Sequence, residues 1–187
     1  MEAMLEACGE RGYRNVSVQH LIDRYGGSRR DFYAHFPSKV ECFADAYERE
    51  IERRHMELME IVVGGDGWTD GLLEGLRRIA AFIGERPALA RGLFLEVHVA
   101  GGRALRKRAE MIARLERTLD EERSERDEAG SAPPSLTAAF MLGSIRHSVN
   151  GALLRGRPRD FAAEVPDFHR LVASAFPGNR HAQEAGG

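Results

Sequence analysis

Residues 12–41 read GYRNVSVQHLIDRYGGSRRDFYAHFPSKVE, and this stretch decides the fold of the N-terminal part of the chain. Ser17 can cap a short helix that begins at Val18, and Gly26–Gly27 ends that helix. Ser28 can cap a second short helix, in which Asp31 completes a capping-box pattern. Two short helices joined by a glycine turn predict a helix-turn-helix motif.

The second of these helices opens with two consecutive arginines, Arg29 and Arg30. In helix-turn-helix proteins the N-terminal residues of the second helix meet base edges in the major groove of DNA. Residues 24–39 hold four basic side chains against one acid, a net charge of +3, whereas residues 1–55 together carry a net charge of −1. The charge therefore predicts a small DNA-contacting patch on a domain that is not basic overall.

The rest of the chain shows helical periodicity of apolar residues and no strand-like alternation, which predicts an all-α fold. Glycine pairs, prolines and the loop EAGSAPP at 128–134 mark the ends of the helices. A turn is expected at 64–67, and the last residues, 177–187, read as a frayed tail. The expected helices span 1–11, 17–25, 28–35, 38–63, a segment before Pro87, 87–99, 103–127, 135–155 and 160–176.

Composition excludes several classes of protein. The 187 residues carry a net charge of −2, which argues against a globally basic nucleic-acid coat. Two cysteines exclude a disulfide scaffold and fit a reducing compartment. The sequence lacks an apolar run of about 18 residues and begins with an acidic stretch unlike a signal peptide, so we expect a cytoplasmic protein without a membrane span.

The N-terminal motif resembles the DNA-binding domain of the TetR family of bacterial transcriptional regulators. The resemblance covers about residues 5–47 and rests on the following residues: Gly12-Tyr13, Ser17-Val18, Leu21-Ile22, Gly26, Ser28, Tyr33, His35-Phe36 and Ser38-Lys39. It implies a DNA-binding domain at 1–47, which includes the start of a fourth helix. An effector-binding and dimerisation domain would follow at 48–176, and a flexible tail at 177–187. It further implies a repressor that binds a palindromic operator as a homodimer and is released by a small molecule.

The expected DNA-binding residues combine the motif with this resemblance, which implies a phosphate contact for the Tyr33 hydroxyl. The carboxylate of Asp31 either caps its own helix or accepts from a cytosine amino group. His35 either contacts phosphate or covers the turn, and Lys39 either contacts phosphate or is solvated. The full expected set is Ser17, Ser28, Arg29, Arg30, Asp31, Tyr33, His35 and Lys39.

Two residues depart from the family pattern. Gly27 stands where a branched apolar residue is usual, and Asp31 stands where a small or hydroxyl residue is common. The chain begins within its first helix, without the short leader of many relatives, so an arm contact with the minor groove is not carried over from the resemblance. These departures leave an alternative open: a helical protein–protein interaction module that has lost DNA binding.

The last two helices are expected to form the dimer interface. The helix at 135–155 has small residues at spacings that allow close helix approach, and the final helix is more apolar than a lone surface helix should be. By resemblance, each subunit would contribute both helices to a four-helix bundle; the alternative is that both pack within the monomer. The expected interface residues are Gly143, Ser144, Gly151, Phe168, Leu171 and Val172.

An effector pocket is implied by the resemblance and is expected among the middle helices. A lining of Met, Phe and His side chains would suit a largely hydrophobic ligand with one or two polar groups. The histidines His98 and His147 could equally be interior or interface residues. The candidate lining residues are Met59, Leu76, Phe94, Val97, His98, Met111, Leu115, Phe140 and His147.

The sequence carries no catalytic motif, and we expect neither an enzyme nor a cofactor. Glu52 and His55 form a Glu-x-x-His pattern on a helix, which di-iron bundles use twice together with two further glutamates. A second copy is missing from the long helices, so no metal site is expected.

Overall fold

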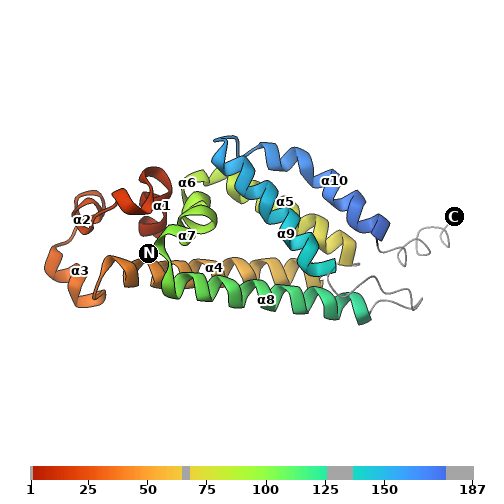
Figure 1. Ribbon diagram of the computed structural model, residues 1–187, viewed down its shortest axis with the longest axis horizontal. Helices are drawn as coiled ribbons and strands as arrows, with labels where there is room; N and C mark the ends of the chain where they lie inside the picture. Colours follow the sequence, from red (N-terminus) through yellow and green to blue (C-terminus); the bar gives the residue numbers. More distant parts are fainter. Residues whose placement is uncertain (1, 65–67, 126–136, 176–187) are drawn as a thin grey trace. The chain divides into compact units, whose positions relative to one another are not determined.

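The computed structural model describes residues 2–64, 68–125 and 137–175, and every regular element in these ranges is a helix (Figure 1). The all-α prediction is therefore confirmed. The expected loop at 128–134, the tail at 177–187 and residues 65–67 of the expected turn lie outside the described residues. The helices of the N-terminal half are α1 (Glu2–Arg11), α2 (Val18–Tyr25), α3 (Arg29–His35) and α4 (Lys39–Gly64), with a 3-10 turn at Tyr13–Asn15.

After α4 the chain continues with α5 (Trp68–Glu85) and α6 (Pro87–Arg91), followed by a widened π-helical turn at Gly92–Glu96. One helix was expected over 87–99, and the structure instead interrupts it with this turn before α7 (Val97–Ala100). The remaining helices are α8 (Gly102–Glu125), α9 (Thr137–Leu154) and α10 (Asp160–Ala175).

The chain divides into two compact units. Met1–His55 together with Phe82–Met111 form what we call the N-terminal unit, and Met56–Ala81 together with Ile112–Gly187 form the C-terminal unit. The domain boundary expected between residues 47 and 48 was placed at the end of the sequence motif, whereas these units combine segments that are far apart in the sequence. The contacts therefore group the helix-turn-helix with α6, α7 and the start of α8, which sequence reasoning had assigned to the other domain.

Helix α1 crosses α6 at very short range. A Cβ atom on Gly9 would lie 1.8 Å from the backbone oxygen of Ala88, and one on Gly92 would lie 2.3 Å from the backbone oxygen of Leu5. Only glycine fits where two helix backbones approach so closely. Around this crossing lies the apolar core of the N-terminal unit, formed by Met4, Leu5, Ala7, Cys8, Tyr13, Val16, Leu21, Cys42, Phe43, Ala46, Tyr47, Leu89, Leu93, Val97 and Ala104.

Within the N-terminal unit, two arginines far along the chain bind acidic residues of α1 and α4. Arg86 contacts Glu2 at 2.7 Å and Glu6 at 2.6 Å, so the start of α6 is bound to the acidic face of α1. Arg103 at the start of α8 contacts three carboxylates of α4, those of Glu41, Asp45 and Glu48, at 2.7–2.8 Å. The hydrogen bonds that Arg103 donates, to Glu48 first and then to Glu41 and Asp45, hold its pKa above the ordinary value.

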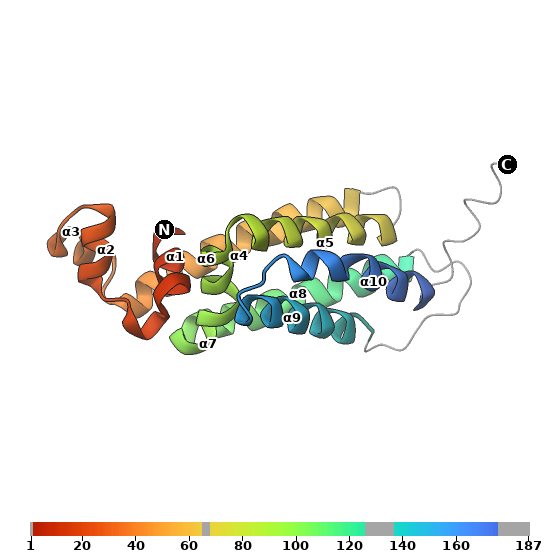
Figure 2. The ribbon, with the colours of Figure 1, turned by 90° about the horizontal axis from the view of Figure 1, so that it is seen from above.

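Within the C-terminal unit, α9 and α10 run beside each other (Figure 2). On α10, the Phe161 and Phe168 rings lie 6.1 Å apart. Buried residues on these two helices include Val149, Ala152, Leu153, Phe161 and Val165.

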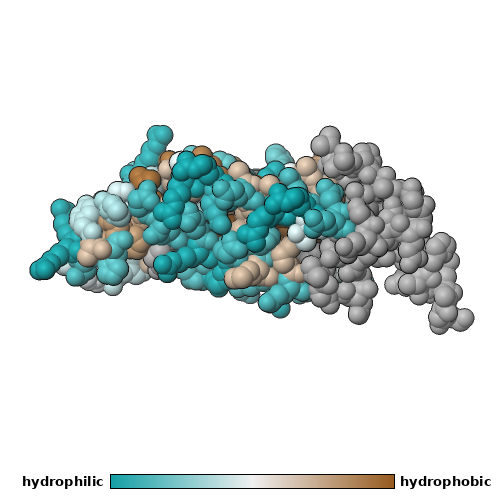
Figure 3. All heavy atoms as spheres, turned by 90° about the horizontal axis from the view of Figure 1, so that it is seen from below, coloured by the Kyte–Doolittle hydropathy of each residue, from teal (hydrophilic) through white to brown (hydrophobic). Residues whose placement is uncertain are grey.

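The described surface in Figure 3 is mostly hydrophilic, with scattered apolar patches. None of the helices described over 2–64, 68–125 and 137–175 combines the length and apolarity needed to cross a membrane.

Candidate nucleic-acid interface

Both helices of the motif begin at the predicted caps. The Ser17 hydroxyl accepts a hydrogen bond from the His20 backbone N–H at 3.2 Å, at the start of α2. At the start of α3, the Ser28 hydroxyl accepts from the Asp31 N–H at 3.1 Å, and the Asp31 carboxylate accepts from the Ser28 N–H at 3.0 Å. Asp31 therefore caps its own helix, and a contact with a cytosine would require this carboxylate to leave the cap.

The turn between the helices explains one departure from the family pattern. Gly26 has φ +81° and Gly27 has φ +103°, a backbone region that residues with a Cβ rarely adopt. A branched residue at position 27 would be strained in this turn. The glycine pair is thus required by the turn as it is built here, and it is no sign of a lost motif.

Helix α3 is held at the surface with most of its side chains outward. None of its residues is buried, and only Phe32 and the following Phe36 pack against the core. The Tyr33 side chain is 55% exposed, and its ring meets that of Phe32 edge-on at 5.3 Å. The Nδ1 atom of His35 donates to the Asp31 backbone oxygen at 2.9 Å, so this side chain lies along the helix.

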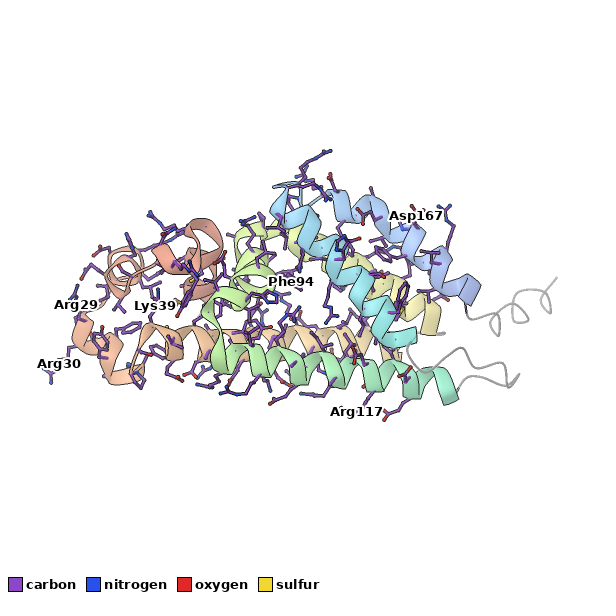
Figure 4. All side chains as sticks on the ribbon, in the orientation of Figure 1. Arg29, Arg30, Lys39, Phe94, Arg117 and Asp167 are labelled. Carbon is purple, nitrogen blue, oxygen red and sulfur yellow. The ribbon has the colours of Figure 1, made fainter. Side chains whose placement is uncertain are left out.

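Arg29 and Arg30 are both exposed, but they differ in their contacts. The Nε atom of Arg29 donates to the side-chain oxygen of Gln19 on α2 at 3.0 Å. Arg30 makes no hydrogen bond or ion pair with any described residue, and it extends away from the ribbon in Figure 4. Sequence reasoning missed Gln19, because a glutamine on an exposed helix face carries no signal until its neighbour is known.

Lys39 lies at the start of α4 but turns back toward the chain (Figure 4). Its ammonium group donates to the backbone oxygens of Tyr13 and Val16, each at 2.9 Å, and lies 4.2 Å from the centre of the Tyr13 ring. On the other side of the same turn, the Glu96 carboxylate accepts from the Tyr13 N–H at 2.7 Å. Two of the three N–H groups of Lys39 are thus engaged, so the geometry favours a structural role over a phosphate contact.

The basic patch predicted at 24–39 is smaller than its charge suggests. Arg24 is paired with Glu10 of α1, and Lys39 is engaged with backbone oxygens. The hydrogen bond that Arg24 donates to the Glu10 carboxylate lowers the pKa of Glu10. Arg29 and Arg30 remain as the exposed cations of α3.

The expected dimer residues lie on α9 and α10 with unequal exposure. Gly143, Ser144, Gly151 and Phe168 are half-buried, Leu171 is 66% exposed, and Val172 is buried within the chain. Ser144 donates to the Phe140 backbone oxygen at 3.0 Å. Two residues that sequence reasoning did not assign to this surface, Phe140 and Leu154, are 79% and 69% exposed.

The expected pocket residues are divided between the two units. Phe94, Val97, His98 and Met111 belong to the N-terminal unit, whereas Met59, Leu76, Leu115, Phe140 and His147 belong to the C-terminal unit. Val97, Met111 and Leu76 are buried, but Phe140, His98 and His147 are exposed. Although the side chain is exposed, partial desolvation of its ring first, and then the positive charge of Arg108, lowers the pKa of His98.

The two residues of the Glu-x-x-His pattern on α4 lie in other surroundings than a metal site. Glu52 pairs with Lys107 at 3.3 Å, and His55 is buried. Over residues 2–64, 68–125 and 137–175, no group of three or more His, Cys, Asp or Glu side chains is arranged to hold a metal ion.

This architecture, with a capped helix-turn-helix whose second helix presents exposed arginines, defines a class of DNA-binding regulator. Residues 1–46 match the sequence profile described as bacterial regulatory proteins, tetR family. The predicted resemblance is confirmed: residues 1–46 match the TetR-family DNA-binding domain. No curated protein matches the sequence.

Solved structures of similar fold have low sequence identity to the chain. The fatty acid degradation regulator FadR of Bacillus halodurans is 16% identical, with a TM-score of 0.77 over 91% of this chain and 94% of that one. FadR of Bacillus subtilis, solved in complex with stearoyl-CoA, is 17% identical, with a TM-score of 0.78 over 93% and 96%. A TetR-family regulator of Pectobacterium atrosepticum is 19% identical, with a TM-score of 0.71 over 94% and 93%.

Proposed function

We propose that this protein is a cytoplasmic transcriptional repressor that binds a palindromic operator as a homodimer and leaves it when a small molecule binds. The observation that carries the proposal is the exposed start of α3. There, two capped helices hold Arg29 and Arg30 outward on a TetR-type domain. Arginine is the side chain that most often reads guanine in the major groove. Ser17, Ser28, Tyr33 and His35 are exposed around these arginines and would contact phosphate.

Binding to DNA is tested with the intergenic DNA beside the protein's own gene, in a gel-shift assay with the full chain. A retarded complex on one segment, competed by that segment and not by unrelated DNA, is the expected result. Failure to bind any such segment or any member of a randomised duplex library would favour the alternative, a protein–protein interaction module. The positive φ of Gly27 and the helix cap formed by Asp31 account for the two departures from the family pattern that had suggested this alternative.

Dimerisation is supported by the exposed apolar side chains of Phe140, Leu154 and Leu171 on α9 and α10. Large apolar side chains gathered on neighbouring helices mark an interaction surface. The glycines of α9 have room for a side chain within the monomer. A Cβ on Gly143 would meet only the Arg146 side chain at 3.8 Å, and one on Gly151 would meet only the flexible Arg155 side chain.

The dimer surface is therefore tested with Gly143→Leu, which the monomer can accommodate. We expect a helical protein that sediments as a monomer and loses operator affinity, because the added bulk separates the two subunits. Ala81→Leu, which adds similar bulk at an exposed position on α5, is the matched control and should remain dimeric. A dimeric Gly143→Leu protein with normal operator binding would place the interface elsewhere.

The effector is proposed to be largely hydrophobic, in line with the apolar residues expected to line the pocket. A long-chain acyl thioester is the first compound to test, because a protein of the same fold was solved with stearoyl-CoA. Release of the retarded DNA by stearoyl-CoA would support this class of effector. Unchanged binding at saturating stearoyl-CoA would exclude it.

A further inference from the structure

Two neighbouring arginines with the same chemistry are presented differently at the start of α3. Arg29 is tethered to α2 through Gln19, whereas Arg30 has no hydrogen bond or ion pair within the described part of the chain. Both side chains belong to exposed residues, so burial does not distinguish them. The hydrogen bond to Gln19 does distinguish them, because it links Arg29 on α3 to a residue of α2.

The orientation of the Gln19 side chain is fixed by a second hydrogen bond. Its Nε2 atom donates to the Asp23 carboxylate at 2.6 Å, one turn further along α2. A carboxylate only accepts hydrogen bonds, so the amide nitrogen must face Asp23. The amide oxygen of Gln19 is thereby turned toward Arg29, where it accepts from Nε. The three side chains form a chain of hydrogen bonds, Asp23 to Gln19 to Arg29.

This chain leaves the end of the Arg29 guanidinium available. Only Nε is engaged by Gln19, so both terminal nitrogens can donate together to the O6 and N7 atoms of a guanine. A side chain already held in place loses less conformational freedom on binding than a free one. Arg30 would lose that freedom in full, and its single charge can be satisfied by a phosphate in many geometries.

We propose that Arg29 is the guanine-reading arginine of this protein and that Gln19 is its positioning residue, while Arg30 supplies a phosphate contact. This inference rests on the proposed function, since it assumes that α3 enters the major groove. It adds a specificity-determining pair that spans α2 and α3, where the sequence pointed to either arginine equally.

The first step of the test defines the binding site. The full-length chain selects duplexes from a randomised library, and every position of the selected duplex is then replaced in turn. Arg29→Ala should flatten the preference at one symmetric pair of positions, by about 5- to 150-fold, the discrimination expected of a bidentate arginine–guanine contact. Arg30→Ala is the matched control; it should weaken binding to all duplexes equally and lower the slope of log affinity against log salt by about 1.

The second step uses Gln19. Gln19→Ala should flatten the preference at the same positions as Arg29→Ala and have no further effect when Arg29 is already Ala. Combined with Arg30→Ala, its effect should instead multiply. Gln19→Glu keeps an acceptor for Arg29 but loses the N–H that donates to Asp23 and adds a negative charge near DNA, so it should lower affinity for all duplexes and retain only part of the base preference. A merely structural role for Gln19 would change affinity without this pattern.

The outcomes separate this inference from the proposed function. If the wild-type chain selects a duplex but Gln19→Ala and Arg29→Ala act independently, the tether has no role and the inference fails alone. A preference flattened by Arg30→Ala and not by Arg29→Ala would overturn it as well. If the wild-type chain selects no duplex, the proposed function fails and this inference fails with it.

Discussion

Helices α1 and α3 belong to the same compact unit but are stabilised in different ways. Half of the ten residues of α1 are buried, and its backbone meets that of α6 at Gly9. Helix α3 buries none of its seven residues and depends on its capping box and two phenylalanines. The difference indicates a firmly packed support in α1 and a surface helix with few packing contacts in α3, which leaves most α3 side chains available to a partner.

The largest effect should come from the crossing of α1 and α6. Gly9→Ala would place a Cβ 1.8 Å from the Ala88 backbone oxygen, so the two helices must separate. We expect the free energy of unfolding to fall by about 3 kcal/mol. Urea denaturation followed by circular dichroism measures it.

Gly84→Ala provides the control for this substitution, because a Cβ there meets nothing within 4 Å. An alanine in a helix is favoured over glycine, so stability should rise by about 0.5–1 kcal/mol. If Gly9→Ala were as well tolerated as Gly84→Ala, the close crossing of α1 and α6 would be wrong.

A smaller effect is expected at Lys39, which links the start of α4 to the turn between α1 and α2. Lys39→Ala removes two hydrogen bonds from a charged donor and should cost about 2 kcal/mol of stability. Operator affinity should fall with an unchanged salt slope, because the side chain positions the turn before α2. A slope lowered by about 1 would instead assign Lys39 to a phosphate, as the sequence motif predicts.

Loss of the α3 cap should have a more local effect. Ser28→Ala removes the hydroxyl that accepts from the Asp31 N–H and should cost about 1 kcal/mol. Amide hydrogen exchange should accelerate in α3 and remain unchanged in α1. Equally accelerated amide exchange in both helices would show that α1 and α3 unfold together, which would contradict the difference in their stability.

The smallest effect concerns the two thiols behind the motif. Burial raises the pKa of Cys8 to about 12 and that of Cys42 to about 11. The folded protein should therefore react slowly with iodoacetamide at about pH 8, and unfolding should expose both thiols. Burial of the two neutral thiols also makes the free energy of unfolding depend on pH. Because their folded pKa values are raised, the buried thiols stabilise the fold fully below the ordinary thiol pKa, and this stabilisation is lost as the pH rises above that value. Rapid labelling of the native protein, followed by mass spectrometry, would contradict the buried placement.

The helix-turn-helix could be predicted because its signals are local. Ser17, Ser28 and the glycine pair act on residues within one helical turn, so their effects can be read from neighbouring letters. The crossing at Gly9 and Gly92 could not be predicted, because it joins residues about eighty positions apart in the sequence. For the same reason, the sequence did not predict that Lys39 would turn back onto Tyr13 or that Gln19 would hold Arg29.

The central claim is that this chain reads DNA with α3 on each side of a symmetric dimer. A hydroxyl-radical footprint of the full chain on its selected duplex tests it most directly. We expect two protected tracts related by twofold symmetry, with centres about 34 Å apart or a multiple of that distance, on one face of the helix. A single tract, or protection without a preferred face, would contradict the claim.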